Sequence, residues 1–228
     1  MRTHFPMKTL CAFLYWLVFA APSPAQSPLD CSALQERRQL DEKALLSAAP
    51  HGAARPTLHR LDVNWSHGVR SFIDVAPYGS GSEEGIRHTY CGYDAASQMH
   101  LIYRYNEDEV DGLVLNDSTG AVLPAGYTVV YTSDHRLYLA IVQPSGMDGQ
   151  EWRIYRNDGR LQAKGPTGTC NSEFRCTEIG EPRWTTAGRV EAKAICWRQD
   201  KEPLRVPVRL VAPDSAWSWA PKQPCKTR

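Results

Sequence analysis

Residues 99–120 read MHLIYRYNEDEVDGLVLNDSTG. Apolar and aromatic residues alternate with polar ones at the start of this stretch, which is the pattern of a β-strand with successive side chains on opposite faces. One face of that strand carries Met99, Leu101, Tyr103 and Tyr105. The polar run at 106–109 is typical of a turn, an apolar segment follows at 110–115, and residues 116–120 form a second turn signal. The stretch therefore predicts an antiparallel strand–turn–strand unit.

The same short rhythm continues on both sides of this unit. Turn signals recur every 8–12 residues across 58–170, and Asn157-Asp158-Gly159 is a strong hairpin signal. We therefore predict a mainly β fold with an antiparallel meander over residues 58–170, closed into a barrel or a sandwich. Apolar residues from Val190 to Cys196 alternate with charged ones, so the cysteine-bounded segment 171–228 is predicted to be a smaller β segment.

The N-terminus has the three-part order of a secretory signal peptide. A charged start precedes the apolar run 10–21, and the small residues Ser23 and Ala25 stand before Gln26. Because a spanning helix needs roughly 20 apolar residues, this run of about a dozen is too short to serve as a membrane anchor. We predict cleavage after Ala25, and a periplasmic or secreted protein without a membrane span.

The segment that follows the signal peptide, residues 26–57, is predicted to contain one helix and a linker. Ser32 and Gln35 have the spacing of a capping box, and helix formers continue as far as Pro50. The helix is expected over residues 32–48.

Six cysteines remain after cleavage, and an even number in an oxidising compartment predicts three disulfide bonds. They are Cys31, Cys91, Cys170, Cys176, Cys196 and Cys225. Six cysteines allow 15 pairings, and the spacing alone does not choose among them. The sequence contains no C-x-x-C motif and no histidine at ligand spacing from a cysteine pair, so no zinc site is expected. A catalytic thiol would normally leave an odd number of cysteines, so none is expected either. Because Cys31 adjoins the predicted helix, its bond should tie that helix to the β region.

The charge of the mature chain is nearly balanced, with 24 basic and 25 acidic residues. A balanced chain lacks the basic footprint of a protein that binds nucleic acid or anionic lipid. We expect neither of these as a partner.

The sequence offers two acidic groups as candidate binding loops, and we expect no metal and no cofactor. The first is Glu83-Glu84 in a Gly/Ser-rich segment, and the second is Glu107-Asp108-Glu109 in the turn described above. Oxygen ligands suit calcium, and a carboxylate pair suits a glycosidase, but solvated loops that contact a partner are the favoured interpretation. G-x-S-x-G, H-E-x-x-H and P-loop motifs are absent, and the histidines are scattered, so we expect no catalytic residues.

The segment 89–170 resembles the periplasmic inhibitors of c-type lysozyme, a family of small β-barrels. The resemblance lies in layout: Tyr90-Cys91 at the start, a strand ending in Tyr105, Leu123-Pro124, Gly126-Tyr127, and a closing cysteine. It implies a β-barrel and a bond between Cys91 and Cys170. The family's inhibitory S-G-x-x-Y motif is absent, and Ala125-Gly126-Tyr127 stands in its place, so no inhibitory residue is carried over.

These observations favour an exported, non-enzymatic binding protein. The more specific hypothesis is an inhibitor or immunity-type protein whose partner is a secreted cell-wall-degrading enzyme. Acidic loops would face a basic enzyme surface, where complementary charge raises the association rate. A structural envelope protein is the main alternative, and an exported polysaccharide or peptidoglycan hydrolase is a further one.

Overall fold

The computed structural model describes residues 29–35, 41–75, 85–106, 109–144, 150–166, 177–185, 189–198, 201–211, 218–221 and 225. The protein is mainly β, as predicted, and the described residues include two short helices, α1 (Ser32–Gln35) and α2 (Glu42–Ser47). The strands form four antiparallel sheets, and none of them closes into a barrel within these ranges. A barrel was therefore the wrong one of the two predicted architectures.

Each sheet is built mostly from strands that follow one another in the chain. The first sheet contains β2 (Ala53–Thr57), β3 (Arg60–Trp65) and β4 (Gly68–Ile73). The second sheet contains β5 (Ile86–Asp94), β6 (Met99–Asn106), β7 (Glu109–Asn116) and β8 (Val122–Ala125). The third sheet contains β1 (Leu29–Asp30), β9 (Thr128–Tyr131), β10 (Leu137–Val142), β11 (Glu151–Arg156) and β12 (Leu161–Pro166). The fourth sheet contains β13 (Thr177–Trp184), β14 (Val190–Arg198), β15 (Lys201–Val211) and β16 (Ser218–Ala220).

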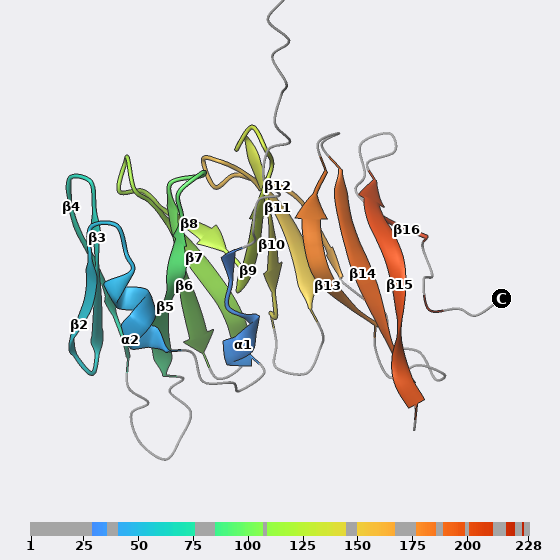
Figure 1. Ribbon diagram of the computed structural model, residues 1–228, viewed down its shortest axis with the longest axis horizontal. Helices are drawn as coiled ribbons and strands as arrows, with labels where there is room; N and C mark the ends of the chain where they lie inside the picture. The colour runs from blue at the N-terminus through green and yellow to red at the C-terminus, as the bar shows by residue number, and fades with distance from the viewer. Residues whose placement is uncertain are drawn as a thin grey trace, which may run out of the picture.

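The four sheets stack face to face along the long axis of the molecule, in chain order (Figure 1). Three apolar layers fill the spaces between neighbouring sheets. Their buried side chains include Leu61, Phe72, Tyr90 and Ile102 in the first layer, Leu101, Tyr103, Val129 and Tyr138 in the second, and Trp152, Ile154, Val190 and Leu210 in the third. The second and third sheets are consequently covered on both faces, while the first and fourth each keep one face in solvent.

The alternation that predicts β6 is confirmed, and both of its faces are buried. Met99, Leu101 and Tyr103 face the third sheet, and Ile102 faces the first sheet. At the position of the turn expected at 106–109, Asn106, the last residue of β6, pairs directly with Glu109, the first residue of β7. Burial of both faces explains why apolar residues occur on both faces of this strand.

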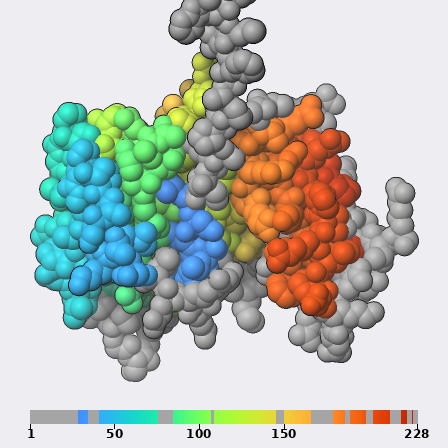
Figure 2. Space-filling view, in the orientation of Figure 1, coloured from blue at the N-terminus to red at the C-terminus, as the bar shows by residue number. Residues whose placement is uncertain are grey.

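The N-terminal region differs from the single predicted helix over 32–48. Asp41 caps a separate helix, α2, because its carboxylate accepts the amide of Ala44 at 3.1 Å. The expected linker also contains a strand, β2. The helices lie along one side of the stack (Figure 2), where Leu45 and Leu46 pack against the first apolar layer. No helix in the described part of the chain is long and apolar enough to cross a membrane.

Two disulfide bonds join described cysteines, Cys31–Cys91 and Cys196–Cys225. The Cys91–Cys170 pairing implied by the lysozyme-inhibitor resemblance is therefore wrong. Pairing of β1 with β9, together with the bond from Cys31 N to Tyr127 O, places the Cα atoms of Cys31 and Cys91 5.8 Å apart. The expected tie between the helical segment and the β region is confirmed, since Cys31 directly precedes α1.

The third predicted disulfide cannot be placed within the described ranges, because Cys170 and Cys176 lie outside them. The two bonds that are present point to an oxidising compartment.

Candidate functional site

Of the acidic residues singled out in the sequence, Glu109 is the one that lies in the described part of the chain, at one end of the second sheet. Glu83, Glu84, Glu107 and Asp108 are outside the described residues, and Glu109 is the half-buried first residue of β7. Ile86 pairs with Asn106, so the chain enters β5 and leaves β6 at the same end. The register thus brings the attachment points of both acidic segments together.

Asp111, which follows this acidic turn, has a structural role. It lies opposite Arg104 in the register of β6 and β7, and Arg104 Nε donates to Asp111 Oδ1 at 2.8 Å. Within the described part of the chain, no group of three or more histidine, cysteine or acidic side chains is arranged to hold a metal ion.

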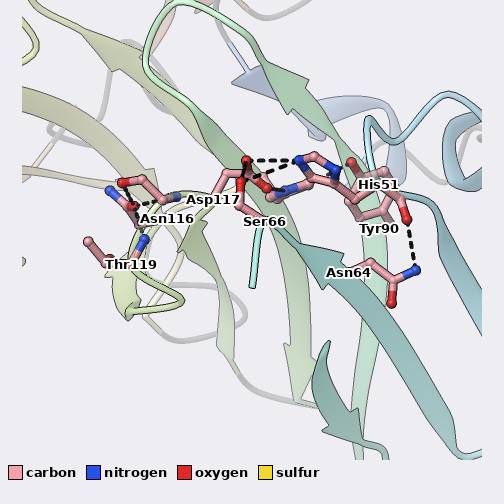
Figure 3. Close-up of polar contacts among 9 residues, drawn as sticks. His51, Asn64, Ser66, Tyr90, Asn116, Asp117 and Thr119 are labelled. Atoms are coloured by element: carbon pink, nitrogen blue, oxygen red, sulfur yellow. Dashed lines mark hydrogen bonds and ion pairs between the residues drawn. The ribbon is translucent and has the colours of Figure 1, made fainter. Parts of the chain in front are cut away.

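The densest polar cluster surrounds Asp117 and was not predicted from the sequence (Figure 3). Its carboxylate accepts three side-chain hydrogen bonds. Ser66 Oγ donates to Oδ2 at 2.7 Å, His51 Nε2 lies 3.1 Å from the same oxygen, and His100 Nε2 lies 3.1 Å from Oδ1. Tyr90 extends the chain of contacts, with its hydroxyl 3.0 Å from His100 Nδ1. We call these five residues the Asp117 cluster.

A tight turn after β7 presents Asp117 to its partners. Asn116 Oδ1 accepts the amides of Ser118 and Thr119 at 3.0 and 2.9 Å, which holds the turn closed. Gly120 has a φ of +67°, and a Cβ there would lie 2.6 Å from the Trp65 ring. Glycine therefore allows Trp65 to pack closely on the turn that carries Asp117.

The cluster fastens the first sheet to the second at one end of their interface. Ser66 lies in the β3–β4 turn and His51 precedes β2, whereas Asp117 and His100 belong to the second sheet. The backbone reinforces the same contact, because Ser66 N donates to Asp117 O at 3.2 Å. The His100 side chain is fully buried, and 6% of the Asp117 side chain is exposed.

The protonation states follow from burial and from the hydrogen-bond pattern. Burial lowers the pKa of His100, which is therefore neutral, and the pattern assigns the proton to Nε2, facing Asp117. Burial also raises the pKa of Tyr90, so its hydroxyl stays protonated and donates to His100 Nδ1. Burial of Asp117 opposes ionisation, but hydrogen bonds from Ser66, His100 and His51 outweigh it and lower the pKa of this carboxyl.

The arrangement is not that of a nucleophilic triad, although it contains serine, histidine and aspartate. In such a triad the histidine uses its two nitrogens for different partners, one for aspartate and the other for serine. Here His51 faces both Asp117 and Ser66 with Nε2, and the Ser66 hydroxyl donates to the carboxylate. A carboxylate of lowered pKa is a weak base. The geometry therefore holds the Ser66 hydroxyl in place without activating it.

A second polar network holds the other end of the same interface. Arg55 of β2 donates to Asp74 at 3.0 Å and to Glu42 of α2 at 2.9 Å. Asp74 Oδ1 also accepts the amide of His88 at 2.8 Å and lies 3.1 Å from its Nδ1. Burial lowers the pKa of His88 despite this contact. Each end of the interface thus contains a buried histidine beside a carboxylate.

Comparisons with known proteins find no counterpart for this chain: no protein-family model, curated protein or solved structure matches it.

Proposed function

We propose that this protein is an exported, non-enzymatic binding protein that inhibits a cell-wall-degrading enzyme in the periplasm or outside the cell. The signal-peptide pattern of residues 1–25 and the two disulfide bonds support export. The choice of enzyme class rests on the order of sequence features in residues 89–170, which resembles that of lysozyme inhibitors, and not on the barrel or the Cys91–Cys170 bond that the resemblance implies. The main support is the composition of one end of the molecule.

At that end of the second sheet, which we call the acidic end, exposed apolar side chains lie near the described residues that flank Glu83-Glu84 and Glu107-Asp108 in the chain. Residue 85 and the 106–109 turn meet there, and Val75 bridges to Ile86 beside them. The large apolar side chains exposed at this end are Leu58 (84% exposed), Ile73 (56%), Val75 (44%) and Tyr105 (43%). Apolar groups next to carboxylates suit the surface of a basic enzyme, since burial supplies affinity and charge guides the encounter.

The hydrogen-bond arrangement of the Asp117 cluster also favours a binding protein over an enzyme. Its serine, histidine and carboxylate are used to join two sheets, and the serine hydroxyl is bonded to a weak base. Polar networks around Asp117 and around Arg55 hold the two ends of the interface between the first and second sheets, which makes this interface rigid. A rigid scaffold lowers the entropy lost when a partner binds.

The proposal is tested with the mature protein, residues 26–228, in an inhibition panel of lysozymes and cell-wall amidases. We expect inhibition of at least one enzyme at micromolar concentration and a complex in size-exclusion chromatography. The double variant Glu83→Lys/Glu84→Lys should slow association by about tenfold at low salt, because electrostatic steering is lost.

The matched control is Asp158→Lys/Glu202→Lys, which changes the net charge equally at exposed positions away from the acidic end. It should associate at nearly the rate of the unmodified protein. Absence of both inhibition and complex formation across the panel would refute the proposed function.

The hydrolase alternative rests on one observation, the 3.4 Å distance between Ser66 Oγ and His51 Nε2. A fluorophosphonate probe reacts with activated serine hydroxyls and tests this alternative directly. We expect intact-mass measurement to show no adduct. The Ser66 hydroxyl donates its hydrogen bond to Asp117, a weak base, and therefore stays protonated and unreactive. Labelling that disappears in Ser66→Ala would instead establish a nucleophilic serine and overturn the non-enzymatic proposal.

A further inference from the structure

The near-neutral charge of the chain conceals a strong asymmetry between its two parts. Residues 26–166 contain 13 basic and 18 acidic residues, whereas residues 167–228 contain 11 basic and 7 acidic residues. The fourth sheet belongs to the second of these parts and forms one end of the stack (Figure 1). The cationic side chains that the structure describes in this second part therefore lie at the end of the molecule opposite the first sheet.

Strand alternation places this charge on the solvent-facing side of the fourth sheet. Val190, Ala192 and Ala194 are buried toward the interior, so Glu191 and Lys193 between them point outward. Residues that lie directly opposite each other in a sheet share a face. Arg183 of β13 and Arg209 of β15 both lie opposite Glu191, so their side chains point outward on the same face. We call this surface the cationic face. Its exposed members are Arg183, Arg189, Lys193, Trp197, Arg205 and Arg209, with Glu181 and Glu191 as the carboxylates among them.

The two carboxylates do not neutralise the cationic face. Glu181 contacts Lys193 and lies 3.0 Å from Arg205, and Glu191 lies 3.0 Å from Arg183. The three cations remain 47%, 58% and 73% exposed, respectively for Lys193, Arg205 and Arg183. Such exposed pairs are weak, so a polyanion can replace them at little cost. Among the side chains that the structure describes on this face, five cations against two carboxylates leave an excess of positive charge.

Trp197 gives the cationic face a second property. Its side chain is 40% exposed and stands in the bulge of β14, which follows the Cys196–Leu204 pair and lies two residues beyond Ile195, the partner of Arg205. An exposed indole on the same sheet as these cations offers an apolar surface for a sugar ring, and the cations offer contacts for its acidic substituents. Arg205 and Arg209 point the same way about 13 Å apart along β15, a separation that a polymer spans and a single sugar ring does not.

We propose that the cationic face of the fourth sheet binds an anionic polysaccharide. Guanidinium and ammonium groups contact the acidic substituents, and Trp197, which lies beyond Arg205 along the sheet, stacks on a neighbouring sugar ring. This binding does not depend on the proposed inhibitory function, because it uses the outer face of the fourth sheet and not the acidic end of the second sheet. It would hold the protein on an acidic glycan while the acidic end remains free.

The test uses the mature protein and polygalacturonate, a carboxylate-bearing glycan, in titration calorimetry at low salt, about 20 mM NaCl, where exposed charges are least screened. Neutral dextran and polyglutamate are the comparison polymers, the first without charge and the second without sugar. We expect polygalacturonate to bind, dextran not to bind, and the affinity for polygalacturonate to fall when the salt is raised to about 150 mM.

Two variants locate the binding surface. Arg205→Ser/Arg209→Ser should weaken polygalacturonate binding about tenfold, because two exposed charge contacts are lost. The matched control Arg136→Ser/Arg156→Ser removes two exposed arginines from hairpins of the third sheet and should bind as the unmodified protein does. Trp197→Ala should weaken binding of polygalacturonate but leave binding of polyglutamate unchanged. Thermal melts of each variant confirm that it is folded.

Three results would overturn the proposal. The first is that polygalacturonate does not bind at low salt. The second is that the Arg136/Arg156 control loses as much affinity as Arg205→Ser/Arg209→Ser, and the third is that dextran binds as tightly as polygalacturonate. If polyglutamate bound as tightly as polygalacturonate and Trp197→Ala changed neither, the face would bind polyanions in general and the polysaccharide assignment would be wrong.

Discussion

Gly126→Ala is expected to prevent folding, or to lower the free energy of unfolding by more than about 3 kcal/mol. Gly126 lies at the corner where the chain passes from β8 in the second sheet to β9 in the third. A Cβ at this position would lie 1.9 Å from the carbonyl oxygen of Ile141 and 2.5 Å from its carbonyl carbon. Both are backbone atoms of a buried strand, so no side chain can move aside to make room.

Gly126 is also closely packed against the second sheet, so its backbone cannot shift away from Ile141. A Cβ on Gly112 would lie 2.3 Å from the carbonyl oxygen of Gly126. Tyr127 N also donates to Ile141 O at 2.9 Å. To relieve the clash, the second and third sheets would have to separate at the apolar layer between them, which is the largest of the core clusters.

Urea and thermal unfolding followed by circular dichroism measure the effect. The control is Gly180→Ala, where a Cβ would lie 3.1 Å from Ile195 Cδ1, the mobile end of a side chain. That substitution should change the free energy of unfolding by less than about 1 kcal/mol. A Gly126→Ala protein that unfolds at nearly the same urea concentration as the unmodified protein would show that the two sheets do not approach as closely as described.

The strands were predictable because their signals are local. In residues 99–120, alternation sets the side-chain faces and polar runs set the turns, and neither depends on distant parts of the chain. Alternation around Val190 likewise predicts one buried and one wet face for β14, as observed. Alternation with a period of two does not show which sheet packs against each face of a strand. The stack of four sheets could therefore not be derived from this pattern.

The errors concern contacts between segments that are far apart in the chain. Cys31 pairs with Cys91 because β1 joins the edge of the third sheet, a contact between residues about 100 positions apart that no local pattern reports. The single expected helix failed for a local reason, since Asp41 is a capping residue inside an otherwise helix-forming run. The Asp117 cluster was missed because His51, Ser66 and His100 meet only when the first and second sheets stack.

Acid is expected to destabilise the protein, beginning near pH 6.5. His100 and His88 are buried at the interface of the first and second sheets, and burial lowers the pKa of both below the ordinary value of 6.5. As the pH falls below 6.5, the unfolded chain binds protons at these histidines before the folded protein does. Stability is therefore fully present above that pH and is lost as the pH falls toward the lowered folded-state pKa values.

The charges around each histidine support this sign. His100 faces Asp117, Tyr90 and Tyr93, and the charge of His51 acts on it from the first sheet. Asp74 favours protonation of His88, whereas the guanidinium groups of Arg104 and Arg55 oppose it. In both cases burial is the largest influence, and the neighbouring carboxylate does not reverse it.

Asp117 extends the loss of stability to lower pH. Its pKa is held below the ordinary value of 3.8 by the hydrogen bonds of Ser66, His100 and His51, which outweigh its burial. Below about pH 4 the unfolded chain therefore takes up a proton at this carboxyl before the folded protein does, and stability falls again. Because each histidine or carboxyl changes stability by at most about 1.4 kcal/mol per pH unit, the two histidines together limit the first slope to about 2.7 kcal/mol per pH unit.

Urea unfolding at a series of pH values between 7.5 and 3 measures both steps. His59→Gln, at an exposed position, should keep the slope below pH 6.5, whereas His100→Gln should reduce it. NMR titration of the histidine ring protons checks the same point in the unmodified protein, where His100 and His88 should titrate below pH 6.5. Stability that stays constant or rises between pH 7 and 5 would mean that the buried histidines are stabilised as cations by Asp117 and Asp74, and the neutral state assigned to His100 would be wrong.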